Sequence, residues 1–374
     1  MQQVEIKKVK TKKDKREFVN LAYNMHKDHK QWVPPLYMHE RHYIDPKKNP
    51  HMKYSETICL LAYKDGKPAG RIMGIINNKL NEIWNTNQAR FCNFESIDDQ
   101  EVCHSLFSEI EKWAKGYKME KLVGPLGFSN QDPQGFLVEG FVERPSVGTI
   151  YNFEYIPRLV ENEGFTKEVD YVTYRIPVPK KVPEIYEKIS KRVLKRMQVK
   201  LVEFHSKGEI KRTLPDVLRF MNETYKDIYG FIPLTEDAIK KATRNYKEIV
   251  DPNLLKVVVD KDNKIISFIL GIKDITPGFI KAKGRLLPLG YFIIKSTQKK
   301  SKRLDLLLGA IAERYRGKGL DTLMAIAMIR SANKLGMTYV DSHHELETNT
   351  KVQAEMKRMG GRIYKRHRVY KKEL

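Results

Sequence analysis

The chain carries a short glycine-rich and basic segment near its C-terminal end whose residue types suit the binding of a diphosphate. Arg314, Arg316 and Lys318 supply cations there, and Gly317 and Gly319 stand beside them. Guanidinium and ammonium groups attract phosphate oxygens. Glycine lacks the Cβ atom that would keep a phosphate away from the backbone amides. The segment therefore predicts a site that holds phosphate groups with backbone N–H groups and cationic side chains.

Two elements must position this segment. The apolar run 306–311 (Leu-Leu-Leu-Gly-Ala-Ile) has the length and composition of a buried strand. The apolar-rich run 320–335 favours a helix that ends before Gly336. The first N–H groups of a helix have no intrahelical partner, and the helix dipole adds positive potential at that end. We therefore expect the amides around Gly317 and Gly319 to be free for a diphosphate.

Two common phosphate-binding motifs can be excluded. The chain has no Gly-x-x-x-x-Gly-Lys-Ser/Thr sequence, and Thr322 stands where the dinucleotide motif requires its third glycine. The pattern Arg-x-x-Gly-x-Gly over residues 314–319 instead resembles the acyl-CoA pyrophosphate loop of the GNAT superfamily of N-acetyltransferases. The alternative is a helix start that is glycine-rich and basic without any binding role. The strand–turn–helix context favours acyl-CoA.

The resemblance to GNAT enzymes implies how acetyl-CoA or another acyl-CoA would bind. In that superfamily the strand before the loop splays from its neighbour, and the pantetheine arm lies in the gap, bonded to the strand backbone. An asparagine after the next strand often contacts the pantetheine as well. The residues implied here are Gly309, Ala310, Ile311, Ala312, Arg314, Tyr315, Arg316, Gly317, Lys318, Gly319, Leu320 and Asn349.

Transfer of the acyl group to an amine needs a base that removes a proton from the acceptor ammonium. Glu345 and Glu347 stand with His343 and His344 at the end of a strand predicted over residues 338–345. Because alternate strand residues face opposite ways, Glu345, Glu347 and His343 share one side and His344 does not. The alternative for each is a solvated strand-end residue. We take Glu347 as the first choice of base, followed by Glu345 and His343.

The chain departs from the superfamily pattern at the position of the acid that would protonate the departing thiolate. Many members carry a tyrosine seven residues after the asparagine, whereas this chain has Met356, whose thioether cannot donate a proton. Tyr364 or Tyr370 could replace it, water could supply the proton, or the protein could bind without turnover. Thiols have a pKa of about 8–9, so the thiolate can also leave unprotonated. No cysteine lies near the loop, so we expect direct transfer.

The order of predicted elements indicates a divergent repeat of two domains. A chain of 374 residues exceeds the size of one ordinary core. The proline-rich segment 174–183 is the best linker. We predict an α/β protein of two tandem GNAT-like domains, residues 1–176 and 177–374, each a mixed, mostly antiparallel sheet flanked by helices. In the first domain, residues 97–101 replace the phosphate loop with helix-capping carboxylates, so no CoA is expected there.

Over its full length the chain resembles a bacterial family of tandem GNAT-like proteins. This resemblance implies a fold and acyl-CoA more directly than it implies an acceptor. The peptidoglycan aminoacyl transferases also pair two such domains, and they use aminoacyl-tRNA in place of acyl-CoA. The shared stretches are Trp32–Leu36, Asn49–His51, Phe94–Glu95, Asp98–Asp99, Gly164–Phe165, Gly317–Asp321 and Leu346–Asn349.

The formal net charge of +23 bears on the partners of the protein. It attracts anions, so tRNA, an acidic lipid surface or an anionic acceptor are candidates beside acyl-CoA and an amine. The alternative is a lysine-rich surface that serves no partner, since the lysines are dispersed. A tRNA-dependent aminoacyl transferase-like or RNA-associated basic protein, and a CoA-binding protein without activity, remain alternatives to the acyltransferase. The insertion 274–302 is expected to form the acceptor side of the site, and its basic end, residues 298–303, fits no strand pattern.

Other features set the expected compartment. No apolar run approaches the ~20 residues that span a bilayer, and residues 1–4 do not begin a signal peptide. The three cysteines are odd in number and lack metal-binding spacing. His39 and His42 have no identifiable third ligand, so no metal site is expected. We therefore expect a cytoplasmic protein.

Overall fold

The computed structural model describes residues 4–374; residues 1–3, where the predicted first domain begins and no signal peptide is expected, lie outside the described part. The first half contains β1 (Glu5–Lys8), α1 (Lys12–Met25), α2 (Tyr37–Tyr43), β2 (Ser55–Lys64), β3 (Lys67–Asn77), α3 (Asn78–Trp84), β4 (Gln88–Ser96), α4 (Gln100–Gly116), β5 (Lys121–Gly124), β6 (Phe136–Glu139), α5 (Ile156–Asn162) and β7 (Thr166–Pro177). The second half contains α6 (Glu184–Met197), β8 (Lys200–Val202), α7 (Lys207–Thr224), α8 (Glu236–Ile249), β9 (Leu255–Val259), β10 (Ile265–Lys273), α9 (Thr276–Lys281), α10 (Gly290–Lys300), β11 (Arg303–Ile311), α11 (Leu320–Lys334), β12 (Tyr339–Ser342), β13 (Glu345–Leu346), α12 (Thr350–Arg358) and β14 (Arg362–Glu373).

One continuous sheet runs through both halves, in the order β1-β2-β3-β4-β5-β14-β7-β12-β11-β10-β9-β8, with β6 and β13 at its side. The pairs β4–β5 and β11–β12 are parallel, and the other described pairs are antiparallel. The predicted α/β class with mixed, mostly antiparallel sheets is therefore confirmed.

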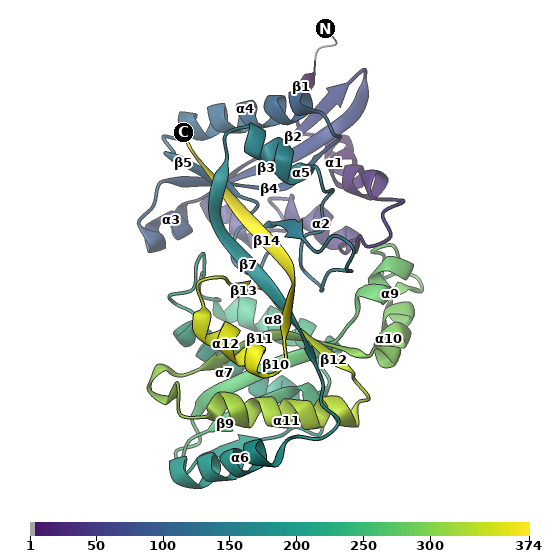
Figure 1. Cartoon of the computed structure of the whole chain (residues 1–374). Coiled ribbons are helices and arrows are strands. Elements are labelled where there is room, and N and C mark those ends of the chain that lie inside the picture. Colours follow the sequence, from purple (N-terminus) through teal and green to yellow (C-terminus); the bar gives the residue numbers. More distant parts are fainter. Residues whose placement is uncertain (1–3) are drawn as a thin grey trace.

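The two halves exchange their last strands. β14, the last strand of the chain, pairs with β5 of the first half, and β7, the last strand of the first half, pairs with β12 of the second. β7 and β14 also pair with each other along most of their length, and Figure 1 shows both long strands crossing between the two lobes. The division at residues 176 and 177 stays a prediction, and hydrogen bonding of the sheet continues across it.

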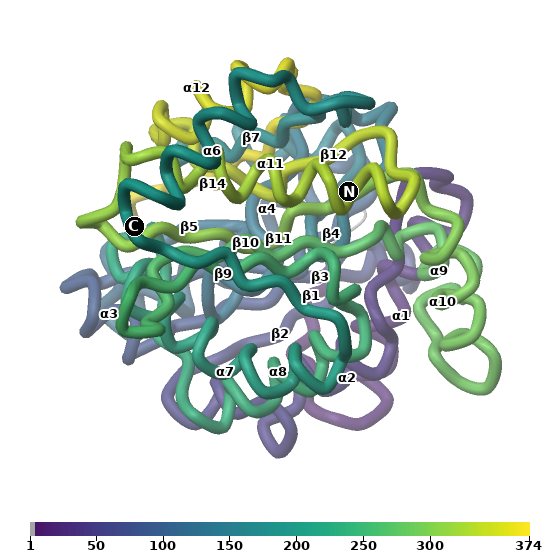
Figure 2. Tube along the Cα trace, turned by 90° about the horizontal axis from the view of Figure 1, so that it is seen from below, coloured from purple at the N-terminus to yellow at the C-terminus, as the bar shows by residue number. Residues whose placement is uncertain are grey.

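Helices cover both faces of the second half of the sheet. Viewed from below, α6 and α11 lie on one side of β9, β10 and β11, and α7 and α8 lie on the other (Figure 2). Two apolar clusters fill these layers: Val193, Leu320 and Leu323 belong to the one under α6 and α11, and Leu214 and Phe268 to the one under α7. None of the helices between residues 4 and 374 combines the length and apolar character that crossing a membrane requires.

Three expected boundaries differ in the structure. The sequence pattern predicts a helix over residues 214–225, whereas α7 begins at Lys207, because the Ser206 side chain accepts from the Glu209 N–H and caps an earlier turn. A helix is also expected over residues 151–162, whereas α5 covers only residues 156–162. The basic residues 298–303 divide between α10 and β11: Arg303 starts the strand, since buried carboxylates neutralise its charge.

Candidate functional site

β11 separates from β12 in the middle of its length. The parallel pairing of the two strands covers residues 303–306 of β11 and stops at Ser342, where β12 ends. On the other edge, the register with β10 shifts between Leu270 and Gly271, which leaves Leu307 as an extra residue in β11. A β-bulge of this kind bends its strand. Residues 307–311 consequently have a free edge toward the gap, and Gly309 is exposed within it.

The backbone groups along this edge alternate in direction. Gly309 and Ile311 point theirs toward the gap, whereas the Ala312 N–H donates to the Ile266 carbonyl of β10 at 2.9 Å, and Ala310 is paired with β10 in the same way. The carbonyl of Ile311 accepts from Arg316 Nε at 3.2 Å. Of the four strand residues implied by the resemblance, two therefore present backbone groups to the gap.

The glycine-rich loop has the geometry of a helix start. Gly317 and Gly319 have φ values of +70° and +90°, in the left-handed region where a Cβ is strained. A Cβ on Gly317 would meet nothing within 4 Å, whereas one on Gly319 would lie 2.8 Å from Val193 Cγ2. α11 begins at the next residue, Leu320, with no side-chain cap. Within the described chain, the N–H groups of residues 317–319 donate to no protein acceptor, which fits an anion-binding helix N-terminus.

Cations surround the loop. The Arg314 guanidinium lies 4.8 Å from the centre of the Tyr315 ring and 3.4 Å from Asp260 Oδ2, and the Lys318 ammonium lies 5.8 Å from the same ring. Within residues 4–374, Arg316 and Lys318 form no ion pair. Two of the three predicted loop cations are therefore free to pair with phosphate oxygens.

Tyr225, which directly follows α7, fills part of the free edge of β11. Its hydroxyl accepts from the Gly309 N–H at 3.1 Å and donates to the Gly309 carbonyl at 3.0 Å. Burial, and to a lesser extent the nearby Glu345 carboxylate, raise the pKa of Tyr225 above its ordinary value. Sequence analysis missed this residue because the partners lie far apart in the chain and no local motif surrounds Tyr225.

Glu345 lies on β13 beside the gap, paired in register with Val172 of β7. Its charge acts on the hydroxyls of both Tyr225 and Tyr174. No cation or hydrogen-bond donor among the described residues contacts its carboxylate, and burial raises its pKa to about 7. A carboxyl group with that pKa is poised to exchange protons at neutral pH.

Glu347 has a different environment. Its carboxylate lies 2.5 Å from Lys167 Nζ and 3.8 Å from an Arg366 nitrogen, and it accepts from the Asp170 N–H at 3.2 Å. These three partners occupy the Glu347 carboxylate, whereas the Glu345 carboxylate has no such contact among the described residues. Although the strand-end location is as predicted, these contacts favour Glu345 over Glu347 as the base.

The histidines beside Glu345, His343 and His344, are half-buried, and they pack near His367, which is fully buried. His343 Nε2 lies 3.2 Å from the Val147 carbonyl, and the His344 ring stacks at 5.3 Å on Tyr171 and lies 4.4 Å from the His367 ring. Burial lowers the pKa of all three histidines. This cluster joins the end of β12 to β7 and β14.

The other predicted residues lie outside the gap. The Tyr364 hydroxyl donates to Asp341 Oδ2 at 2.6 Å, and the Tyr370 hydroxyl donates to Glu161 Oε1 at 2.8 Å. Met356 packs in an apolar cluster on the α12 side of the sheet. The Asn349 side chain caps α12 by accepting from the Val352 N–H. Neither tyrosine offered as a replacement acid thus presents a free hydroxyl to β11.

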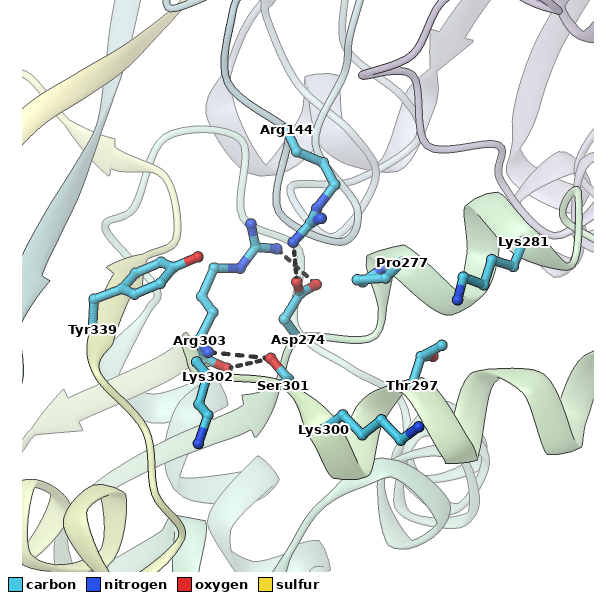
Figure 3. A pocket seen from close by; sticks show the side chains of 10 residues that line it. All are labelled: Arg144, Asp274, Pro277, Lys281, Thr297, Lys300, Ser301, Lys302, Arg303 and Tyr339. Carbon is cyan, nitrogen blue, oxygen red and sulfur yellow. Dashed lines mark hydrogen bonds and ion pairs between the residues drawn. The ribbon is translucent and has the colours of Figure 1, made fainter.

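Tyr364 belongs to a buried ionic network at the junction of the two halves. Arg303 pairs with Asp274 and Asp305 at 2.8 Å each, and Asp274 also pairs with Arg144 of the first half at 2.6 Å. Figure 3 shows Arg144, Asp274 and Arg303 at one wall of a pocket of about 260 Å³ that residues of α9 and α10 also line. The balanced charges give this network a structural role.

The exchanged sheet, the splayed β11 and the loop before α11 together form the fold of tandem GNAT proteins. A tandem GNAT protein from the clavulanic acid biosynthesis pathway superposes with a TM-score of 0.56 at 10% identity, covering 99% of this chain and 98% of that one. A GCN5-related N-acetyltransferase from Sphaerobacter thermophilus gives a TM-score of 0.54 at 12% identity, covering 99% and 95%.

Two proteins resemble the chain in sequence along nearly its whole length. The bacterial ceramide synthase of Caulobacter vibrioides is 25% identical over 376 residues, which covers 98% of this chain and 96% of that protein. Protein YghO of Escherichia coli is 23% identical over 377 residues, with coverages of 97% and 94%. No family model matches the sequence.

Proposed function

We propose that the protein is an N-acyltransferase that moves an acyl group from acyl-CoA directly to the amine of an acceptor. The observation that carries this proposal is the free edge of β11, which leads from Glu345 and Tyr225 to the loop before α11. An extended pantetheine arm can pair with Gly309 and Ile311 as a strand does, and a diphosphate suits the free amides and cations of the loop. The cofactor would thus be acetyl-CoA or a longer acyl-CoA.

In the proposed reaction, Glu345 accepts a proton from the acceptor ammonium, and the free amine attacks the thioester carbonyl. The C–N bond forms, and the nitrogen of the tetrahedral intermediate then carries one proton too many for an amide. That proton passes to solvent as the C–S bond breaks and the CoA thiolate leaves. The Tyr225 hydroxyl can donate a hydrogen bond to the departing sulfur. Its raised pKa exceeds that of a thiol, so the sulfur takes its proton from solvent.

We propose a long-chain amino alcohol as the acceptor. Support comes from the similarity of the whole chain to a bacterial ceramide synthase, since a ceramide is an N-acylated amino alcohol of this kind. The buried setting of Glu345, without a cationic partner, also suits a site that excludes water around an apolar substrate. We place the reaction in the cytoplasm, and we assign binding of acyl-CoA to residues 177–374 and none to residues 1–176. No contact favours tRNA over acyl-CoA.

Calorimetric titration of the full chain with acetyl-CoA and with palmitoyl-CoA tests the cofactor. We expect each acyl-CoA to bind saturably and to be displaced by free CoA, because acetyl-CoA, palmitoyl-CoA and free CoA all carry the same diphosphate. Release of CoA thiol on addition of sphinganine, with an N-acylated product, tests the acceptor. Absence of binding to either acyl-CoA by folded protein would refute the acyltransferase proposal, whereas binding without sphinganine turnover would refute only the acceptor.

A further inference from the structure

The segment between β10 and β11 carries an exposed apolar cluster that neither the core nor the candidate active site uses. This segment forms α9, α10 and the loop between them, and it projects at the right of the molecule in Figures 1 and 2. Among the described residues, twelve large apolar side chains are exposed, and five of them lie within the seven positions 286–292. This density exceeds that of apolar residues scattered singly over a surface. We call this cluster the apolar tip; it comprises Leu286, Leu287, Leu289, Tyr291 and Phe292.

The apolar tip is held in place by the rest of the protein. The Gly284 carbonyl accepts from the Tyr37 N–H at 2.9 Å, and the Arg285 guanidinium lies 4.9 Å from the centre of the Tyr37 ring. The loop then turns so tightly that a Cβ on Gly290 would lie 1.7 Å from the Arg285 carbonyl oxygen. On the inner side of α10, Ile294 is buried in the core. The tip therefore presents its apolar side chains from a fixed backbone.

The same segment is positively charged throughout. Residues 275–304 contain eight lysines and arginines and no aspartate or glutamate. Within the described structure, Arg303 alone among these eight pairs with a carboxylate. Arg285 lies against the Tyr37 ring and Lys295 donates to the Glu248 carbonyl, which leaves five lysines to bind an external anion. Some of these lysines also line the pocket of Figure 3. The five are Lys281, Lys283, Lys299, Lys300 and Lys302.

We propose that α9, α10 and the apolar tip dock the protein onto an anionic phospholipid surface. Leucine, tyrosine and phenylalanine side chains suit the boundary between headgroups and acyl chains, and lysines beside them attract lipid phosphates. A membrane offers many phosphates over a wide area, which matches cations spread over the whole segment. The proposal stands apart from the proposed function, because binding to vesicles requires no turnover.

Cosedimentation with phospholipid vesicles tests this docking. The test variant is Leu287→Ser with Phe292→Ser, which are 84% and 68% exposed. The matched control is Val142→Ser with Ile185→Ser, which are 83% and 61% exposed but lie outside the segment. We expect the parent and the control to bind vesicles rich in phosphatidylglycerol, with weaker binding at raised salt. Loss of two inserted side chains should weaken binding about tenfold or more.

Vesicles of phosphatidylcholine alone provide the charge control, and we expect much weaker binding to them. A melting curve for each variant confirms that it is folded. No binding of the parent to anionic vesicles would overturn the proposal, and so would equal binding of parent and tip variant. Retention of vesicle binding by the tip variant with loss of tRNA binding would assign the surface to RNA and also overturn it.

Discussion

The hydroxyl of Tyr225 is bonded to both backbone groups of Gly309, as donor to its carbonyl and as acceptor from its N–H. An unpaired strand edge leaves its backbone groups without partners, and a single side chain satisfies both here. An extended ligand that pairs with β11 needs the same two groups. Tyr225 and the pantetheine arm therefore compete for Gly309 in the proposed function.

Replacing Tyr225 with phenylalanine should separate binding from turnover. Without the hydroxyl, the Gly309 groups are free before acyl-CoA arrives, so the dissociation constant for acyl-CoA should stay the same or fall. Turnover should fall roughly tenfold, because the departing sulfur loses a hydrogen bond worth about 1–1.5 kcal/mol. Calorimetry and a thiol-release assay measure the two effects. Tyr364→Phe is the control, since that hydroxyl donates to Asp341 and should leave both values near those of the parent.

If Tyr225→Phe weakened acyl-CoA binding and left the turnover number unchanged, Tyr225 would be a binding residue and have no part in the chemistry.

The pH profile identifies the base. Burial raises the pKa of Glu345 to about 7, so its carboxyl is protonated below that pH and able to accept a proton above it. Activity should therefore rise through about pH 7, well above the range of an ordinary glutamate. Glu345→Gln should remove this rise and lower activity by about 10²–10⁴. Assays of acyl transfer between about pH 5 and 9 give the profile, with both limits lying about two units from that pKa.

Glu347→Gln is the matched comparison. Lys167 and Arg366 occupy the Glu347 carboxylate, so it is not available to the acceptor, and its replacement should keep the shape of the profile. Titration of the acceptor amine is common to all three proteins and cancels in the comparison. The reverse outcome, with Glu347→Gln inactive and Glu345→Gln retaining the parental profile, would return the role of base to Glu347.

The part of the site that sequence predicts is the part built from neighbouring residues. Glycine, cations and a helix start occur within one short segment, so the loop at residues 314–320 is readable from local pattern. The sequence also predicts that Glu345 and Glu347 lie at the end of one strand, and the alternation of strand residues places both on the same face. What distinguishes the two is Lys167 and Arg366, which come from β7 and β14. Tyr225 reaches Gly309 only through the packing of α7 on the sheet.

The fold shows the same limit. The Ser206 and Glu209 pair is a local capping signal that could have located the start of α7, and Asp99 caps α4 as expected. The exchange of β7 and β14 has no local signal, because either strand has the pattern of a final strand in its own half. The start of β11 is not recognisable from sequence because it contains Arg303 and Asp305. Charged residues are unusual in a central strand unless partners neutralise them, as these two residues do for each other.

Replacement of Gly317 by valine should abolish acyl-CoA binding while the protein stays folded. Nothing in the protein lies within 4 Å of a Cβ at this position, so the side chain would project into the space beside the free amides. The left-handed φ of +70° adds strain of about 1–2 kcal/mol. Gly66→Val is a matched control, because Gly66 has a φ of +71° and equally open surroundings in the turn between β2 and β3. It should match the loss of stability and keep acyl-CoA binding.

Calorimetry and thermal melting of both glycine variants separate the two effects. Unchanged acyl-CoA affinity in Gly317→Val would place the diphosphate elsewhere.

Each histidine at the junction of the halves should lower protein stability as the pH drops below about 6.5, whereas Glu345, with its pKa raised to about 7, acts in the opposite direction. Burial lowers the pKa of His367 to about 3 from its ordinary value of about 6.5, and it lowers those of His343 and His344 as well. Between these two pH values the unfolded chain binds protons that the folded protein excludes, so acid favours unfolding. Each excluded proton contributes a slope of about 1.4 kcal/mol per pH unit to the free energy of unfolding.

Urea unfolding at pH 7, 6 and 5 measures this slope. His367→Gln should reduce it, since glutamine has no titrating group, while His104→Gln, at an exposed position on α4, should leave it near that of the parent. A slope that His367→Gln leaves unchanged would show that acid acts through other groups.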